Sequence, residues 1–335
     1  MSTPASARSS SQAGILAVRL GSMGDVIHAL PAVATLKHSF PGASVTWLIE
    51  PKWACLLEGN AFVDDVIVLD RKTRAGIGHA WRRLRACRFR FAVDFQGLFK
   101  SALAASVARA DRIYGFHQSQ AREPVAALFY SNRVRTESAH VVDRNLELAA
   151  AAGASAVVRA FPLPEGRPEG DLPEGGFILA SPQAGWPAKQ WPLEHYTALA
   201  VLLDRKLGLR LVLNGPTEAA PLLTSVQGAA VHVSGLPGLI HATRRASAVV
   251  GIDSGPLHLA AALGKPGVAV FGPTDPERNG PYCKSIAVLR DPRAVTSYKR
   301  TTQADPSMRA IRPETVFEAL EEKLAGRSRP ADQIA

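Results

Sequence analysis

A single carboxylate lies in the glycine turn GSMGDVIHALP, residues 21–31, between an apolar run and a segment with helical patterning. Gly21 and Gly24 permit a tight turn from a strand into a helix. The turn lacks the GxGxxG of a dinucleotide site and the lysine motif of a P-loop. Asp25 can cap the helix, or it can act as a general base at the end of the strand. These two roles are compatible, and His28, one turn later, is expected to be a packing residue.

A second candidate is an anion-binding turn in GIDSGPLHLAAALGKP, residues 251–266. It follows an apolar run, and it contains a proline that suits the first position of a helix. The amides of Ser254, Gly255 and Leu257 would then lack partners at a helix N-terminus, where the dipole favours an anion. The Ser254 hydroxyl and the His258 ring can reach the same anion. An ordinary capped helix with a buried histidine is the alternative.

Two more polar side chains follow apolar runs in the second half of the chain. Lys189 is the lone cation of the loop SPQAGWPAKQWPLEHY, residues 181–196, and could reach a phosphate. Glu218 follows the run LRLVLNG, residues 209–215, where an acidic side chain can hydrogen-bond ribose hydroxyls. A lysine in a loop is commonly solvated, so neither residue defines a site by itself.

Composition excludes several classes of protein. The 335 residues, 47% hydrophobic and 20% charged, indicate a soluble globular protein of one large or two medium domains. The longest apolar runs are too short to cross a bilayer. The three cysteines form neither a CxxC pair nor a zinc pattern, which favours reduced thiols in a cytoplasmic protein. Residues 1–14 lack the apolar stretch of a signal peptide and are predicted to be a disordered tail.

The net charge of +10 is concentrated in RKTRAGIGHAWRRLRACRFR, residues 71–90, which has eight Lys or Arg residues and no acid. Such a run can bind nucleic acid, an anionic membrane surface or an acidic substrate. A solvated helix face is the simpler alternative. The chain has no aromatic-basic nucleic-acid motif, so we expect no nucleic-acid partner.

Short apolar runs alternate with helical patterns along the whole chain. Strands are predicted at 15–20, 44–50, 64–70, 89–95, 177–182, 209–215, 246–252 and 267–273. Helices are predicted at 100–109, 141–152, 193–206, 218–226, 237–244 and 256–263. The stretches between strands are long enough for crossover helices, which indicates parallel sheets.

A proline- and glycine-rich segment, FPLPEGRPEGDLPEGG, separates the two halves at residues 161–176 and is predicted to be a linker. The sequence therefore predicts an α/β protein with two Rossmann-like domains, residues 15–160 and 177–312. Ligands should bind outside the carboxyl ends of the strands. The last segment, residues 313–335, is expected to form a helix that packs back on the first domain.

Together these segments resemble glycosyltransferase family 9, the bacterial heptosyltransferases of lipopolysaccharide core assembly. The resemblance extends from about Ile15 to Leu324 and rests on SMGDVIHALPA, KQWP, DSGPLHLAAALGKP and FGPTDP. DFQGLFKSAL and AREPVAALFY, residues 94–103 and 121–130, resemble the type I enzymes. A type II enzyme, or a relative that uses a different nucleotide sugar or acceptor, remains the alternative.

The resemblance implies a GT-B fold with the nucleotide sugar bound mainly by the second domain. It implies an inverting transfer of L-glycero-D-manno-heptose from ADP-heptose to the Kdo region of Kdo-lipid A, with no metal or other cofactor. It also implies a cytoplasmic enzyme that is peripherally associated with the anionic surface of the inner membrane. One departure is that Ala184 and Gly185 precede Lys189, where the family often has Ser or Thr.

The resemblance also assigns roles to residues. Asp25 matches the catalytic base. The donor-binding positions are Lys189, Glu218, Asp253, Ser254, Gly255 and His258. Charge placement together with the resemblance gives the acceptor-binding candidates Arg82, Arg83, Arg85, Gln96, Lys100 and Arg122.

Overall fold

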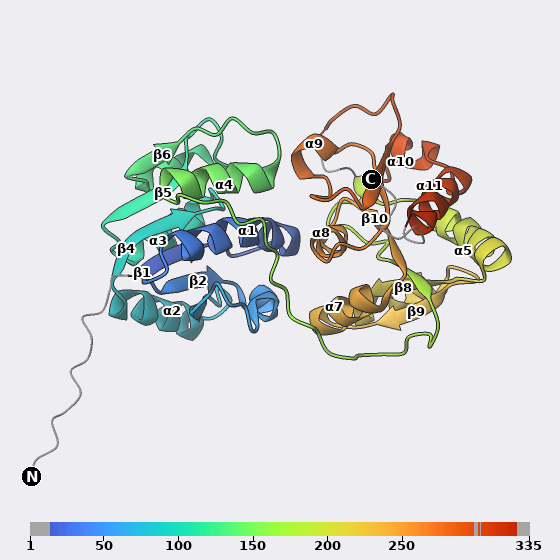
Figure 1. The fold of residues 1–335 in the computed structure, drawn as a ribbon, viewed down its shortest axis with the longest axis horizontal. Coiled ribbons are helices and arrows are strands. Elements are labelled where there is room, and N and C mark those ends of the chain that lie inside the picture. The colour runs from blue at the N-terminus through green and yellow to red at the C-terminus, as the bar shows by residue number, and fades with distance from the viewer. Residues whose placement is uncertain (1–13, 298–300, 302, 327–335) are drawn as a thin grey trace, which may run out of the picture. The chain divides into compact units, whose positions relative to one another are not determined.

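The structure, a computed structural model, describes residues 14–297, 301 and 303–326. The tail expected over residues 1–14 lies outside the described residues, apart from Gly14. The chain divides into two compact units, coloured blue to green and yellow to red in Figure 1. The first unit comprises residues 14–21, 29–138 and 142–162. The second comprises the chain from Leu163 onward together with two short segments, 22–28 and 139–141.

The first unit is built on a six-stranded parallel sheet of order β3-β2-β1-β4-β5-β6. Its strands are β1 (Gly14–Val18), β2 (Val45–Ile49), β3 (Asp65–Val68), β4 (Phe89–Asp94), β5 (Arg112–Phe116) and β6 (Asn132–Val134). Its helices are α1 (Met23–Ser39), η1 (Pro51–Leu57), α2 (Arg74–Ala86), α3 (Phe99–Val107), η2 (Pro124–Phe129) and α4 (Val141–Ala151). The start of α1, residues 23–28, and the first residue of α4 belong to the second unit. The strand order reverses between β1 and β4, and sheets of this kind bind ligands at such a point.

Three of these helices form one layer on the sheet. Leu16 and Val18 of β1 share a hydrophobic cluster with Ala80 and Leu84 of α2 and with Ala105 of α3. A smaller cluster joins α3 to η2 and the residue that follows it, through Ala102, Ala126, Ala127 and Tyr130. The elements α2, α3 and η2 therefore cover the same face of the first sheet, with α3 between the other two.

A buried carboxylate fixes the turn between β4 and α3. Asp94 is fully buried and accepts hydrogen bonds from the Tyr130 hydroxyl (2.7 Å), the Ser101 hydroxyl (2.8 Å) and the Gln96 amide (2.9 Å). Burial raises the pKa of Asp94 despite these donors. The network ties the carboxyl end of β4 to the first turn of α3 and to the end of η2.

Replacing Tyr130 by phenylalanine should lower the free energy of unfolding by about 2 kcal/mol, because the Asp94 carboxyl then loses a donor it cannot replace with water. Urea denaturation followed by circular dichroism measures this. Tyr196→Phe is the matched control: the Tyr196 hydroxyl is buried, and the described part of the chain gives it no hydrogen-bond partner. We expect the control to be neutral or stabilising. Equal losses in both variants would rule out the hydrogen bond as the cause.

The second unit repeats the architecture with a parallel sheet of order β12-β11-β10-β7-β8-β9. Its strands are β7 (Phe177–Ala180), β8 (Arg210–Gly215), β9 (Ala230–Val233), β10 (Ala248–Ile252), β11 (Gly267–Phe271) and β12 (Ile286–Arg290). Its longer helices are α5 (Leu193–Leu207), α7 (Leu236–Arg245), α8 (Gly255–Ala262) and α11 (Pro313–Ala325). The short ones are η3 (Pro187–Lys189), η4 (Thr217–Ala219), α6 (Ala220–Thr224), α9 (Pro276–Asn279) and α10 (Pro306–Ala310).

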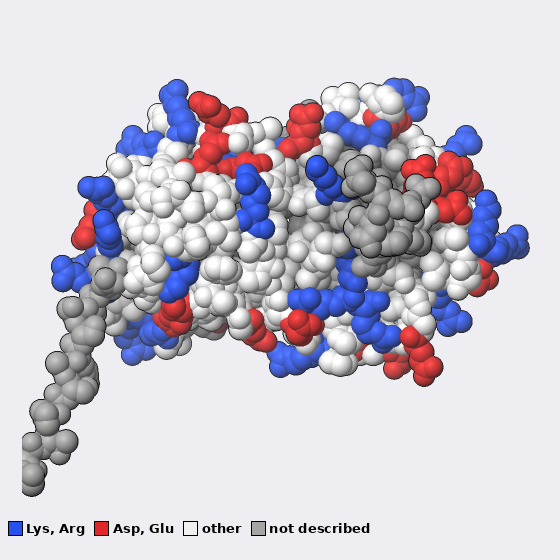
Figure 2. Space-filling view, viewed as in Figure 1, with Lys and Arg blue, Asp and Glu red and all other residues white. Residues whose placement is uncertain are grey.

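The central strands β7, β10 and β11 are buried along their whole length, as expected for a parallel sheet covered on both faces. The predicted α/β class with two parallel sheets is confirmed. In the view of Figure 2, basic and acidic side chains are intermixed over both units, so this face carries no single large patch of positive charge.

The last helix differs from its prediction. The apolar side chains Val316, Phe317 and Leu320 of α11 are buried in the core of the second unit, where α11 contacts α5, β11 and β12. The sequence predicted that residues 313–335 pack on the first domain instead; residues 327–335 lie outside the described residues. This error has a physical reason: an amphipathic stripe shows that a helix is covered, but it does not identify the surface that covers it.

The segment that joins the units is held in place along part of its length. Residues 163–176 contain no helix or strand, in agreement with their proline and glycine content. The Arg244 guanidinium donates to the carbonyl groups of Leu163 (2.9 Å) and Pro164 (3.0 Å). The Glu169 carboxylate accepts from the Gly235 amide at 2.7 Å. The segment is thus fastened to α7 by side-chain hydrogen bonds.

Candidate active site

The turn between β10 and α8 has the form of an anion site. Ser254 precedes the first residue of α8 in an extended conformation, and its side chain makes no capping hydrogen bond. Its hydroxyl oxygen and His258 Nδ1 are buried, and neither has a hydrogen-bond partner among the described residues. The Leu257 amide, counted as a free donor in the sequence argument, instead donates to the Ser254 carbonyl at 3.1 Å. Unsatisfied buried polar atoms are uncommon, and a bound oxyanion would satisfy these.

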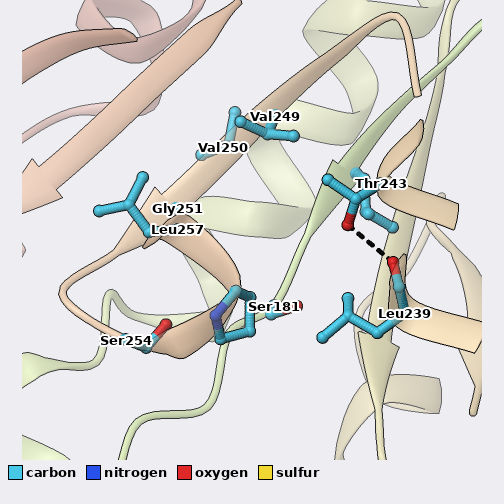
Figure 3. A pocket seen from close by; sticks show the side chains of 10 residues that line it. Ser181, Leu239, Thr243, Val249, Val250, Gly251, Ser254 and Leu257 are labelled. Atoms are coloured by element: carbon cyan, nitrogen blue, oxygen red, sulfur yellow. Dashed lines mark hydrogen bonds between the residues drawn. The ribbon is translucent and has the colours of Figure 1, made fainter. Parts of the chain in front are cut away.

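Two further side-chain hydroxyls near this turn are also buried without a hydrogen-bond partner among the described residues. Ser181 follows β7 and Thr274 follows β11, and these strands lie on either side of β10. Figure 3 shows Ser181 and Ser254 lining one small pocket at the carboxyl end of β10. Sequence reasoning assigned no role to Ser181 or Thr274, although each is the first hydroxyl after an apolar strand.

A buried ion pair holds the same turn. Lys189 Nζ lies 2.6 Å from Asp253 Oδ2, and His258 Nε2 lies 3.6 Å from the other carboxylate oxygen. Burial would raise the pKa of Asp253, but the contact with His258 and the charge of Lys189 outweigh it and hold that pKa well below its ordinary value. The carboxylate therefore stays ionised at neutral pH. The lysine ammonium carries three donors, so it can bind a phosphate while it remains paired.

Asp25 has a different place in its helix from the one expected. Because α1 begins at Met23, Ser22 is the residue before the helix and Asp25 is its third residue. Asp25 Oδ2 accepts from the Ser22 amide (3.1 Å) and the Ser22 hydroxyl (3.0 Å). This is the reciprocal half of a capping box rather than an N-cap. The Ser-x-x-Asp spacing could have revealed it in the sequence.

The first turn of α1 lies against the first turn of α8 within the second unit. A side chain on Gly24 would overlap the His258 ring, and a Cβ on Gly255 would lie 2.7 Å from Met23 Sδ. The rings of His28 and His258 are 4.3 Å apart, centre to centre. The two glycines thus permit a close approach, within the second unit, of residues 22–28 at the start of α1 to the first turn of α8.

The other donor candidate lies apart from this cluster. Glu218 is an exposed residue of η4, just after β8. Its position at the carboxyl end of the second sheet is the one from which an acidic side chain can reach a ribose. Its side chain makes no hydrogen bond or ion pair with Lys189 or Asp253, both of which the structure describes, so its role stays a prediction.

The structure does not bring the six acceptor candidates together. Helix α2 runs from the carboxyl end of β3 to the amino end of β4, so its last residues lie at the edge opposite the ligand-binding edge. Arg83 illustrates this, because it pairs with Asp65, the first residue of β3, at 2.8 Å. Arg82 and Arg85 occupy the same half of the helix and are exposed. This placement argues against acceptor binding by all three.

The other three candidates follow the carboxyl ends of strands. Gln96 is buried, and its side-chain oxygen accepts from the Leu20 amide at 2.8 Å, which joins the ends of β4 and β1. Lys100 lies 3.6 Å from Glu50, at the end of β2. Arg122 is exposed in the segment between β5 and η2. Lys100 and Arg122 are therefore the acceptor candidates that this edge of the sheet supports.

Known proteins resemble this chain in both sequence and architecture. The model of glycosyltransferase family 9 (heptosyltransferase) matches residues 77–307. The chain is 31% identical to lipopolysaccharide heptosyltransferase 1 of Escherichia coli K12 over 312 residues, 83% of this chain and 94% of that protein. It is 28% identical to lipopolysaccharide heptosyltransferase 2 of Salmonella typhimurium over 354 residues, 93% of this chain and 98% of that protein.

Among solved structures, the E. coli heptosyltransferase WaaC with ADP-2-deoxy-2-fluoro heptose superposes with a TM-score of 0.73 at 28% identity. The match covers 92% of this chain and 99% of the E. coli chain. Two α/β units with six-stranded parallel sheets, matched over nearly their whole length, define a glycosyltransferase of the GT-B class. The chain belongs to glycosyltransferase family 9, the heptosyltransferases.

Proposed function

We propose that this enzyme transfers L-glycero-D-manno-heptose from ADP-heptose to the Kdo region of Kdo-lipid A, as a type I heptosyltransferase. The observation that carries the proposal is the packing of the Asp25 turn against the β10–α8 turn, whose buried Ser254 and His258 atoms lack partners. A carboxylate and an oxyanion site so close together suit attack by a hydroxyl on a sugar diphosphate.

The chemistry is a single displacement at the anomeric carbon. Asp25 accepts the proton of the acceptor hydroxyl as its oxygen bonds to that carbon. The bond from the carbon to the diphosphate oxygen breaks on the opposite face, so ADP leaves and the configuration inverts. Negative charge grows on the diphosphate, and Lys189 with the first turn of α8 stabilises it.

The acceptor would be held by cations at the carboxyl edge of the first sheet. Lys100 and Arg122 can pair with carboxylate and phosphate groups of Kdo-lipid A. Because that acceptor is a lipid, we further propose that the enzyme works at the anionic cytoplasmic face of the inner membrane. None of the helices in the described residues is long and apolar enough to cross a membrane, so this association would be peripheral.

The type I assignment can be tested directly with two acceptors. The protein is incubated with ADP-heptose and either Kdo-lipid A or Kdo-lipid A that already carries one heptose, and products are weighed by mass spectrometry. We expect one heptose to be added to the first acceptor only. Addition only to the second would instead indicate a type II heptosyltransferase, the alternative to which the 28% identity with a protein named lipopolysaccharide heptosyltransferase 2 also points. No product with either acceptor would refute the proposal.

A further inference from the structure

Exposed apolar side chains gather on one face of the first unit. Twelve large hydrophobic side chains are exposed among the residues that the structure describes. Half of them lie on the layer formed by α2, α3 and η2: Ile77, Trp81, Phe99, Leu103, Val125 and Leu128. Leu128 is 72% exposed and Trp81 is 49% exposed, although both are costly to leave in water. Such a cluster marks an interaction surface more often than scattered residues do.

These six residues form a continuous surface, here termed the docking face. On α2, Ile77 and Trp81 are four residues apart and share one side of the helix. Phe99 and Leu103 have the same spacing on α3, which contacts both α2 and η2. The Phe99 ring also lies 5.6 Å from that of Phe129, the last residue of η2.

The surroundings of the docking face are strongly basic. Residues 71–110 contain ten Lys or Arg residues and one acid, Asp94, which is fully buried. Helical spacing puts exposed Arg74 and Arg85 on the side of α2 that carries Trp81. Acids from neighbouring segments also reach these helices: Glu123 accepts a hydrogen bond from the Phe99 amide at 2.7 Å. Asp65 pairs with Arg83 at 2.8 Å, and Glu50 lies 3.6 Å from Lys100. Arg85 thus borders the docking face, whereas it lies far along α2 from the ligand-binding edge.

We propose that the docking face inserts into the interface of an anionic lipid bilayer. Trp81 and Leu128 would enter the boundary between headgroups and acyl chains, while Arg74 and Arg85 contact lipid phosphates. Apolar burial combined with cationic attraction is the usual basis of peripheral membrane binding. The proposal deepens the proposed function, since it names the surface that would bring the enzyme to a lipid acceptor. A second copy of the chain is the competing occupant.

Binding is tested with vesicles that contain neither donor nor acceptor, so the result does not depend on transferase activity. The protein is sedimented with vesicles of phosphatidylglycerol and phosphatidylethanolamine, and separately with phosphatidylcholine vesicles. We expect binding to the anionic vesicles, weakened by added salt. Brominated lipid should quench the fluorescence of the wild-type protein, and Trp81→Phe should remove most of that quenching.

The decisive variant combines Trp81→Ser, Leu103→Ser and Leu128→Ser, and it should lower the vesicle partition coefficient about tenfold or more. Its control combines Val201→Ser, Leu222→Ser and Val288→Ser, which are 41%, 39% and 41% exposed in the second unit, and should bind as the wild type does. Leu128→Ser alone should show a smaller loss and provides a variant with little risk to folding.

Failure of this proposal is distinguishable from failure of the proposed function. The triple variant should keep wild-type transfer to detergent-dispersed acceptor and lose transfer to acceptor embedded in vesicles. Normal vesicle binding by the triple variant would overturn the proposal that the docking face binds the bilayer, even if heptose transfer occurs. A wild-type dimer in light scattering that the triple variant abolishes, without vesicle binding, would also overturn it and would identify a protein interface.

Discussion

Replacing Asp25 by asparagine should lower kcat for heptose transfer by about 10²–10⁴-fold and leave the affinity for ADP unchanged. Asparagine keeps the size of the side chain and an oxygen that can accept from Ser22, so the first turn of α1 should persist. It cannot take up a proton from the acceptor hydroxyl. Steady-state kinetics measure the first quantity, and calorimetric titration with ADP measures the second.

Ser22→Ala is the control for this prediction. It removes the hydroxyl that donates to Asp25 Oδ2 at 3.0 Å but leaves the backbone donor at 3.1 Å. A change of only a few-fold in kcat is expected, because the carboxylate is still present and still held. If Asp25→Asn transferred heptose as fast as Ser22→Ala does, the carboxylate would be a structural capping group and the base would have to be another residue.

Most central strands of the two sheets could be predicted from the sequence, as could the edge strand β3, which lies within the predicted strand 64–70. The other three edge strands of the described sheets could not. Strands such as β1 and β10 are buried throughout and therefore appear as continuous apolar runs. The edge strands β6, β9 and β12 are partly exposed, so their residues show neither a continuous run nor a clean alternation. The inner strand β5 was also missed, since its first two residues, Arg112 and Ile113, are not fully buried.

The candidate site was predictable in its loops but not in its contacts. Local patterns located the turns that carry Asp25 and Asp253, because a glycine between a strand and a helix is a local signal. The pairing of Lys189 with Asp253 joins residues 64 positions apart, and only the fold brings them together. The direction in which α2 runs across the sheet likewise depends on which strands it connects. The sequence alone therefore could not show that Arg82, Arg83 and Arg85 lie at the edge of the sheet opposite the expected acceptor site.

The pairing of Lys189 with Asp253 predicts that stability and donor affinity respond differently to substitution. Asp253→Leu should lower the free energy of unfolding by about 3 kcal/mol, since it leaves a largely buried ammonium without its partner. Lys189→Met should also destabilise the protein, by leaving the buried carboxylate with His258 alone. In the double variant neither charge remains, so its loss should be smaller than the sum of the two single losses by about 2 kcal/mol. Urea denaturation of the four proteins measures this difference.

Donor affinity should not recover in the same way. Lys189→Met should raise the Kd for ADP about 10–100-fold, the effect of one charged hydrogen bond to a phosphate. The double variant should bind ADP as weakly as Lys189→Met does, because removing Asp253 cannot restore a cation. Since the pKa of Asp253 is depressed in the folded protein, the stabilising pair should persist at neutral pH and be lost only as the pH falls into the acid range. Wild-type ADP affinity in Lys189→Met would show that this lysine serves only to hold Asp253 and the α8 turn in place.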